Sequence, residues 1–151
     1  TLADRIHRLS QRLIRAHELQ GTIDAVETSL REDFDAMHSV LVLFLEQARP
    51  LESIAGRFLR CADAGDADIK SFESLLTSGK PRCGQVRDAQ RDYLFGKDSV
   101  EIGSVALTPL GPKGELGILA IGASDAERFH PAMSTEFLSR IGELVTYALL
   151  R

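Results

Sequence analysis

The clearest hydrophobic pattern lies near the C-terminal end of the chain. Residues 104–110 and 116–123 form two apolar runs rich in Val, Leu and Ile, and a Gly-Pro-Lys-Gly-Glu segment at 111–115 separates them. Short apolar runs divided by Gly and Pro are typical of a β-hairpin, so we expect two paired strands joined by a solvent-exposed turn. Further on, His130 and Pro131 indicate the start of a long terminal helix, because proline is favoured in the first helical turn. The apolar side of that helix would consist of Phe137, Leu138, Ile141, Leu144, Val145 and Ala148.

A helical pattern also runs through residues 1–20. Apolar residues recur there in steps of four and three, which is the heptad pattern of an amphipathic helix. Two heptads do not distinguish a dimerising helix from one that packs on its own domain, so both interpretations stay open. Because the pattern is already present at Thr1, we expect a fragment of a longer chain, with 1–20 as a dimerisation or signalling helix and 21–151 as the domain. The candidate dimerisation residues are Leu2, Ile6, Leu9, Leu13 and Ala16.

The next segment predicts a helix and two strands. Residues 20–22 interrupt the first helix, and Thr22 is expected to cap a second one. Residues 39–45 form a continuous apolar run, typical of a strand that is buried on both faces and here ends at Arg49-Pro50. Residues 57–62 alternate charged and apolar side chains, as a half-exposed neighbouring strand would. The apolar side of the second helix consists of Ile23, Val26, Leu30 and Phe34.

Shorter elements are predicted between these strands and the hairpin. Apolar residues within 69–76 indicate a short helix that ends at Gly79, and the residues after Pro81 are expected to be extended. Residues 87–95 predict a further short helix that Gly96 stops. Val100, Ile102 and Val105 should then lead into the hairpin as a strand.

The hairpin, Phe129 and the terminal helix together resemble the C-terminal half of a GAF domain. Within that superfamily, the stretches Pro81-Arg82-Cys83-Gly84, Phe129-His130-Pro131 and FLSRIGELVTYAL are similar to an uncharacterised bacterial GAF-like family of unknown function. The resemblance covers residues 22–151. It implies an α+β, profilin-like fold, in which a largely antiparallel sheet of five or six strands carries the second and last helices on one face. Short helices and loops from residues 61–99 would cover the other face.

Composition narrows the class of protein. The chain has 151 residues, 44% of them hydrophobic, which is enough for a single domain with a core. Its net charge of −4 argues against a dedicated nucleic-acid or membrane-surface partner, and it has no apolar run long enough to span a membrane. Two cysteines without C-x-x-C spacing predict neither a disulfide scaffold nor a metal site, and they favour a cytoplasmic location.

The resemblance also implies a ligand cavity over one face of the sheet, walled by residues within 61–99. Arg87 and Arg91 are four residues apart on a predicted helix, so with Arg82 they would offer a cationic fork to a small anionic ligand. Two other interpretations stay open: the arginines pair with Asp88 and Asp92 in solvent, or the apolar side chains fill the cavity. The ligand and any cofactor are unknown. The candidate pocket residues are Cys61, Phe72, Arg82, Cys83, Arg87, Arg91 and Leu94.

Cys83 is the one candidate nucleophile. Lys80, Arg82 and Arg87 are near it in sequence and could lower its thiol pKa, but no histidine lies nearby to act as a base. The alternative is an inert cysteine that packs as a small apolar residue, and it is the favoured interpretation. The Cys83-Gly84 pair resembles the free methionine sulfoxide reductase branch of the GAF superfamily, which uses several cysteines, including one before the penultimate strand. Residues 97–110 contain no cysteine, so no catalytic residue is assigned.

Three functions remain after these observations. The leading hypothesis is a non-enzymatic regulatory or sensor module that acts through a small ligand, through homodimerisation, or through both. The alternatives are a thiol-dependent redox enzyme of the free methionine sulfoxide reductase type centred on Cys83, and an interaction scaffold without a ligand.

Overall fold

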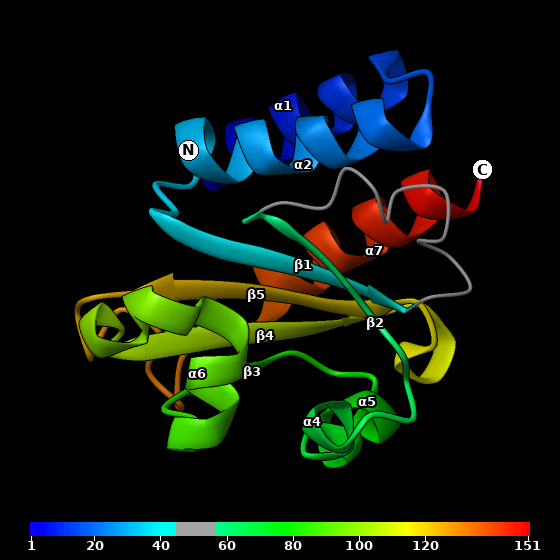
Figure 1. The fold of residues 1–151 in the computed structure, drawn as a ribbon. Helices are drawn as coiled ribbons and strands as arrows, with labels where there is room; N and C mark the ends of the chain where they lie inside the picture. The colour runs from blue at the N-terminus through cyan, green and yellow to red at the C-terminus, as the bar shows by residue number, and fades with distance from the viewer. Residues whose placement is uncertain (45–56) are drawn as a thin grey trace.

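The computed structural model describes residues 1–44 and 57–151, and a five-stranded sheet lies at its centre (Figure 1). The strands are β1 (His38–Phe44), β2 (Leu59–Ala62), β3 (Arg82–Gly84), β4 (Ser104–Leu110) and β5 (Gly117–Ala123). Their order in the sheet is β2-β1-β5-β4-β3. All neighbouring strands are antiparallel except β1 and β2, which are parallel, so the sheet is mixed. The expected α+β, GAF-like fold is confirmed.

Helices cover both faces of the sheet (Figure 1). One side carries α1 (Leu2–Arg15), α2 (Leu19–Asp33) and α7 (Glu136–Leu150), with α1 packed against both of the others. The other side carries α4 (Ala67–Lys70), α5 (Glu73–Ser78) and α6 (Asp88–Phe95). Two 3-10 segments follow, η2 (Gly96–Glu101) and η3 (Pro112–Gly114). None of the helices in the described ranges is long and apolar enough to cross a membrane.

The predicted strand that is buried on both faces corresponds to β1. Successive side chains of a strand point to opposite faces, so Leu41 and Leu43 enter the core under α1, α2 and α7, while Val40 and Val42 enter the core under α4, α5 and α6. Both cores are closed, and these side chains are buried. The prediction of a strand covered on both faces is therefore confirmed.

The predicted hairpin is formed by β4 and β5, which pair from Ser104 opposite Ala123 to Leu110 opposite Gly117. The turn between them is only partly exposed. Lys113 and Glu115 face solvent, but Gly114 has a positive φ and packs so closely on α5 that a Cβ there would lie 2.5 Å from a methyl carbon of Leu76. The hairpin turn therefore also supports the short helix beneath it.

The boundary between the first two helices differs from the prediction. Residues 20–22 lie inside α2, and Thr22 is buried rather than acting as a cap. The break comes at Ala16, whose backbone is extended and whose N–H donates to the carbonyls of Arg12 and Leu13. A glycine in the first turn of a helix is tolerated, so Gly21 does not interrupt the chain there.

Two further predicted boundaries were wrong. The terminal helix begins at Glu136, because His130 instead forms a turn in which its carbonyl accepts from Met133 N–H and its Nδ1 accepts from Ala132 N–H. The segment before the hairpin is the 3-10 helix η2, so β4 begins only at Ser104. The predicted strand end at Leu45 and the Arg49-Pro50 stop lie outside the described residues.

The contact between α7 and β4 predicts opposite effects for two glycine substitutions. A Cβ at Gly142 would lie 2.6 Å from Cγ2 of the buried Thr108, whereas one at Gly21 would meet Ala16 Cβ at an ordinary 3.7 Å. Gly142→Ala should lower the free energy of unfolding by about 1–3 kcal/mol through overpacking. Gly21→Ala should raise it by up to about 1 kcal/mol, since alanine favours helix. Urea denaturation measures both, and a Gly142→Ala variant as stable as Gly21→Ala would contradict the tight contact.

Candidate functional site

We call the sheet face that α4, α5 and α6 cover the second face. Its middle is filled by side chains and holds no ligand cavity among the described residues. Phe72 and Leu94, both predicted to line a pocket, are buried there together with Leu75 and Phe95. They pack against Val40, Val42 and Ile118 of the sheet. The interpretation in which the apolar residues fill the predicted cavity therefore describes this region.

A small pocket of about 190 Å3 remains beside β3. Phe72, Leu75 and Val105 form its apolar floor, and Ser74 and Arg82 stand at its rim. Arg82 is exposed, and its two terminal nitrogens donate to Ser74, at 2.9 Å to Oγ and 3.1 Å to the carbonyl oxygen. Arg82 therefore ties β3 to α5, and the pocket is smaller than the usual range for drug-sized ligands.

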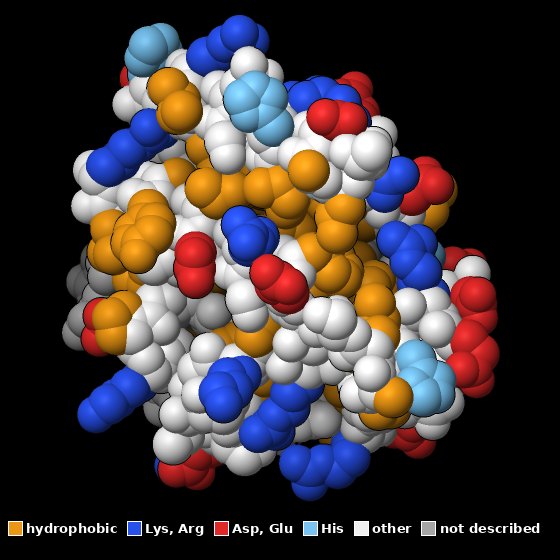
Figure 2. Space-filling model, turned by 180° about the vertical axis from the view of Figure 1, so that it is seen from behind, with side chains coloured by type: hydrophobic (Ala, Val, Ile, Leu, Met, Phe, Trp, Pro, Cys, Tyr) orange, Lys and Arg blue, Asp and Glu red, His pale blue; other side chains and the backbone are white. Residues whose placement is uncertain are grey.

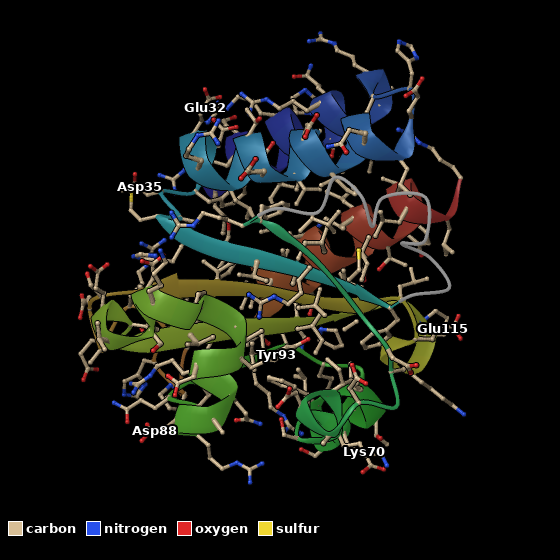
Figure 3. All side chains as sticks on the ribbon, viewed as in Figure 1. Glu32, Asp35, Lys70, Asp88, Tyr93 and Glu115 are labelled. Atoms are coloured by element: carbon tan, nitrogen blue, oxygen red, sulfur yellow. The ribbon has the colours of Figure 1, made fainter. Side chains whose placement is uncertain are left out.

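The three predicted arginines do not converge on this pocket. Arg87 donates to the Ser71 carbonyl at 3.4 Å and only approaches the rim. Arg91 pairs with Asp88 at 3.2 Å, and Asp88 points away from the sheet at the start of α6 (Figure 3). Of the three, only Arg82 lines the pocket, and the cationic fork remains a prediction that this arrangement does not support.

Both predicted cysteines pack against the core on the first side of the sheet, and Cys83 also borders the pocket beside β3. Cys83 lies opposite Ala106 and Cys61 lies on β2, and both pack against the core under α1, α2 and α7. Arg82 pairs with Leu107 and points to the other face, because neighbouring residues of a strand alternate. Burial raises the pKa of the Cys83 thiol, so the prediction that neighbouring cations lower it was wrong. This environment does not activate a nucleophile.

The predicted dimerisation helix packs on its own domain along much of its length. Leu9 and Leu13 are buried in the core that α2 and α7 share, while Ile6 and Ala16 are half-buried and Leu2 is exposed. Polar contacts strengthen this packing. Arg8 Nε donates to Asp33 Oδ1 at 3.0 Å, and Arg12 pairs with Glu32 at 3.2 Å. Leu9 and Leu13 are therefore used within the chain, and dimerisation through α1 would need other side chains.

Three such side chains are large, apolar and exposed at the C-terminal ends of α1 and α7. The exposed fractions are 73% for Ile14, 69% for Tyr147 and 54% for Leu150. The two helix ends are held together because Arg151 donates to the carbonyls of Leu13 and Ala16. We call Ile14, Tyr147 and Leu150 the helix-end patch. Seen from behind, hydrophobic side chains gather across the helical side of the molecule, interrupted by single charged residues (Figure 2).

Sequence reasoning did not assign the helix-end patch. Ile14 lies off the heptad pattern of residues 1–20, and Tyr147 and Leu150 are absent from the apolar side predicted for the terminal helix. Helical periodicity indicates their exposure. Leu138, Ile141 and Val145 occupy the buried side of α7, and Tyr147 and Leu150 fall outside that side. Within the described ranges, no group of three or more His, Cys, Asp or Glu side chains could hold a metal ion.

Comparison with known proteins identifies a family but no activity. A family model described as "Protein of unknown function, DUF484" matches residues 1–151, which is the whole chain. This match is consistent with the resemblance to an uncharacterised bacterial GAF-like family. A search of curated proteins finds no match.

The raised pKa of the Cys83 thiol predicts slow alkylation. In a Cys61→Ser variant, iodoacetamide should modify Cys83 at pH 7 more slowly than it modifies glutathione, because less of the thiol is ionised. The rate should rise about tenfold per pH unit until the pH passes the raised pKa. Unfolding the same variant in urea should restore the glutathione rate. A folded protein that reacts faster than glutathione at pH 7 would revive the redox-enzyme hypothesis.

Proposed function

The chain belongs to the DUF484 family of proteins of unknown function, and from that starting point we propose a non-enzymatic regulatory module that self-associates through the helix-end patch. The proposal keeps the small-ligand input and the cytoplasmic location expected from the sequence. The raised pKa of Cys83 offers no support to a thiol enzyme. The single observation that carries the proposal is the exposure of Ile14, Tyr147 and Leu150 on neighbouring helix ends.

Large apolar side chains in water favour association, because each Å2 of apolar surface that is buried contributes about 25 cal/mol. The helix-end patch combines two aliphatic side chains with a tyrosine, a residue enriched at interfaces because its ring is apolar and its hydroxyl can stay hydrated. A second copy carries the same patch, so a two-fold arrangement would bring the two patches together. A homodimer is therefore the simplest assembly that covers these side chains.

The same helices would carry a regulatory signal. α1 is bonded to α2 through Arg8 and Asp33 and to α7 through Arg151, so a shift of any one helix is shared with the others. A ligand or partner that changes the packing of this layer would change the patch and with it the assembly.

A second candidate is a scaffold without a ligand. The filled centre of the second sheet face favours it, since Phe72, Leu94 and Phe95 occupy the position where the resemblance implied a cavity. In that case the helix-end patch would still bind a partner, but no small molecule would alter the assembly.

Charge reversal of the patch tests the self-association. We expect the chain to be dimeric by light scattering at tens of micromolar, and Ile14→Glu and Tyr147→Glu each to weaken the dimer at least tenfold, about 1.4 kcal/mol, because a buried unpaired carboxylate is unfavourable. Met37→Glu is the matched control, since Met37 is 81% exposed but precedes β1, away from both helix ends. A monomeric wild-type chain, or a dimer that both patch variants leave intact, would refute the proposal.

A further inference from the structure

A second and larger cleft lies at the other edge of the sheet, where β1 and β2 begin and α6 ends. Its volume is about 570 Å3, within the range of ligand sites. We propose that this cleft binds a small polyanion, a molecule with at least two carboxylate or phosphate charges. The inference goes beyond the self-association, because none of the helix-end patch residues lines the cleft.

The cleft gathers positive charge on a chain whose net charge is −4. Its walls hold two carboxylates, Glu27 and Asp98, and twice as many permanent cations. Asp98 is already engaged, because Arg57 donates to it at 2.6 Å and His38 Nδ1 lies 3.9 Å away. His38 also has Glu101 at 3.5 Å on its other nitrogen. The cations that line the cleft are Arg31, Arg57, Arg60 and Lys97.

Arg60 is the cation of this set on which the proposal depends most. It points to the second sheet face, since it alternates with Leu59, which packs on the first. The residue is half-buried, and no carboxylate of the described residues lies within ion-pair distance of its guanidinium. A half-buried guanidinium without a carboxylate partner has N–H donors that are not bonded to a negative charge. An anion in the cleft would accept hydrogen bonds from these donors.

Tyr93 holds this guanidinium in place. The Arg60 guanidinium carbon lies 5.0 Å from the centre of the Tyr93 ring, a cation–π distance. Tyr93 lies on the side of α6 that faces α4 and α5 (Figure 3), and its ring packs on that of Phe72 at 6.4 Å between centres. Burial raises the pKa of Tyr93, so the phenol stays neutral at physiological pH. The cation–π contact therefore restricts where the Arg60 guanidinium can lie, beside the cleft that it lines.

The charge balance indicates how many charges the ligand carries. With Arg57 paired to Asp98, the lining cations Arg31, Arg60 and Lys97 have no carboxylate partner among the described residues, and Glu27 is the other carboxylate that lines the cleft. A monoanion would satisfy only one arginine. A polyanion would satisfy two, through the planar donor fork that matches both carboxylate and phosphate groups.

Thermal unfolding with two probes tests the site. Inorganic pyrophosphate and citrate represent the phosphate and carboxylate forms of a polyanion, and sodium chloride at the same ionic strength controls for screening. At least one probe should raise the melting temperature of the wild-type chain above the chloride control, because a ligand that binds only the folded state stabilises it. Arg60→Gln should abolish this rise, and Arg60→Lys should retain part of it, since lysine keeps the charge but loses the fork.

Arg5→Gln is the matched control, because Arg5 is exposed on α1 and its replacement changes the net charge equally. It should keep the full response to the probe. If Arg60→Gln does not fold, Arg31→Gln replaces an exposed cation on the cleft wall and should reduce the response at least several-fold. The proposal is overturned if neither probe exceeds the chloride control, or if Arg60→Gln and Arg5→Gln respond alike. Tyr147→Glu should respond as the wild type does, which separates this result from the self-association.

Discussion

Burial of both faces of the β1–β5 pair is the constraint on which the rest of the structure depends. These two central strands have apolar side chains on each face, so either face left in water would expose a large apolar area. Two independent cores follow, one under α1, α2 and α7 and one under α4, α5 and α6. The short helices of the second side are thus required by the sheet, whatever else they do.

The same constraint moves possible binding sites away from the middle of the sheet. Phe72 and Leu94 fill the centre of the second face, so open space is found beside the edge strands, next to β3 and at the start of β2. An edge strand has backbone N–H and C=O groups that no second neighbouring strand bonds. These groups, together with nearby polar side chains, are suited to binding polar ligands. The first side is filled at its centre, and among the described residues its large exposed apolar side chains lie at helix ends.

Local patterns predicted most of the fold, whereas features set by distant contacts were missed. The hairpin, the central strand and the short helices could be predicted because their signals lie within a few residues. The parallel pairing of β1 with β2 could not, since strand direction depends on the path between strands. The error at Cys83 had a similar origin: Arg82 is its neighbour in sequence but lies on the other face of the strand. Tyr147 and Leu150 fall outside the apolar side predicted for the terminal helix, but their position next to the end of α1 depends on distant contacts.

The bond from Arg151 to the carbonyls of Leu13 and Ala16 joins segments separated by more than a hundred residues. The side chain that satisfies these carbonyls at the end of α1 therefore belongs to a residue that follows the rest of the domain in sequence. Such a long-range closure forms late, because the entropy of the intervening chain must first be lost. We therefore expect the last turn of α1 to be completed late in folding, after the domain between these residues has assembled.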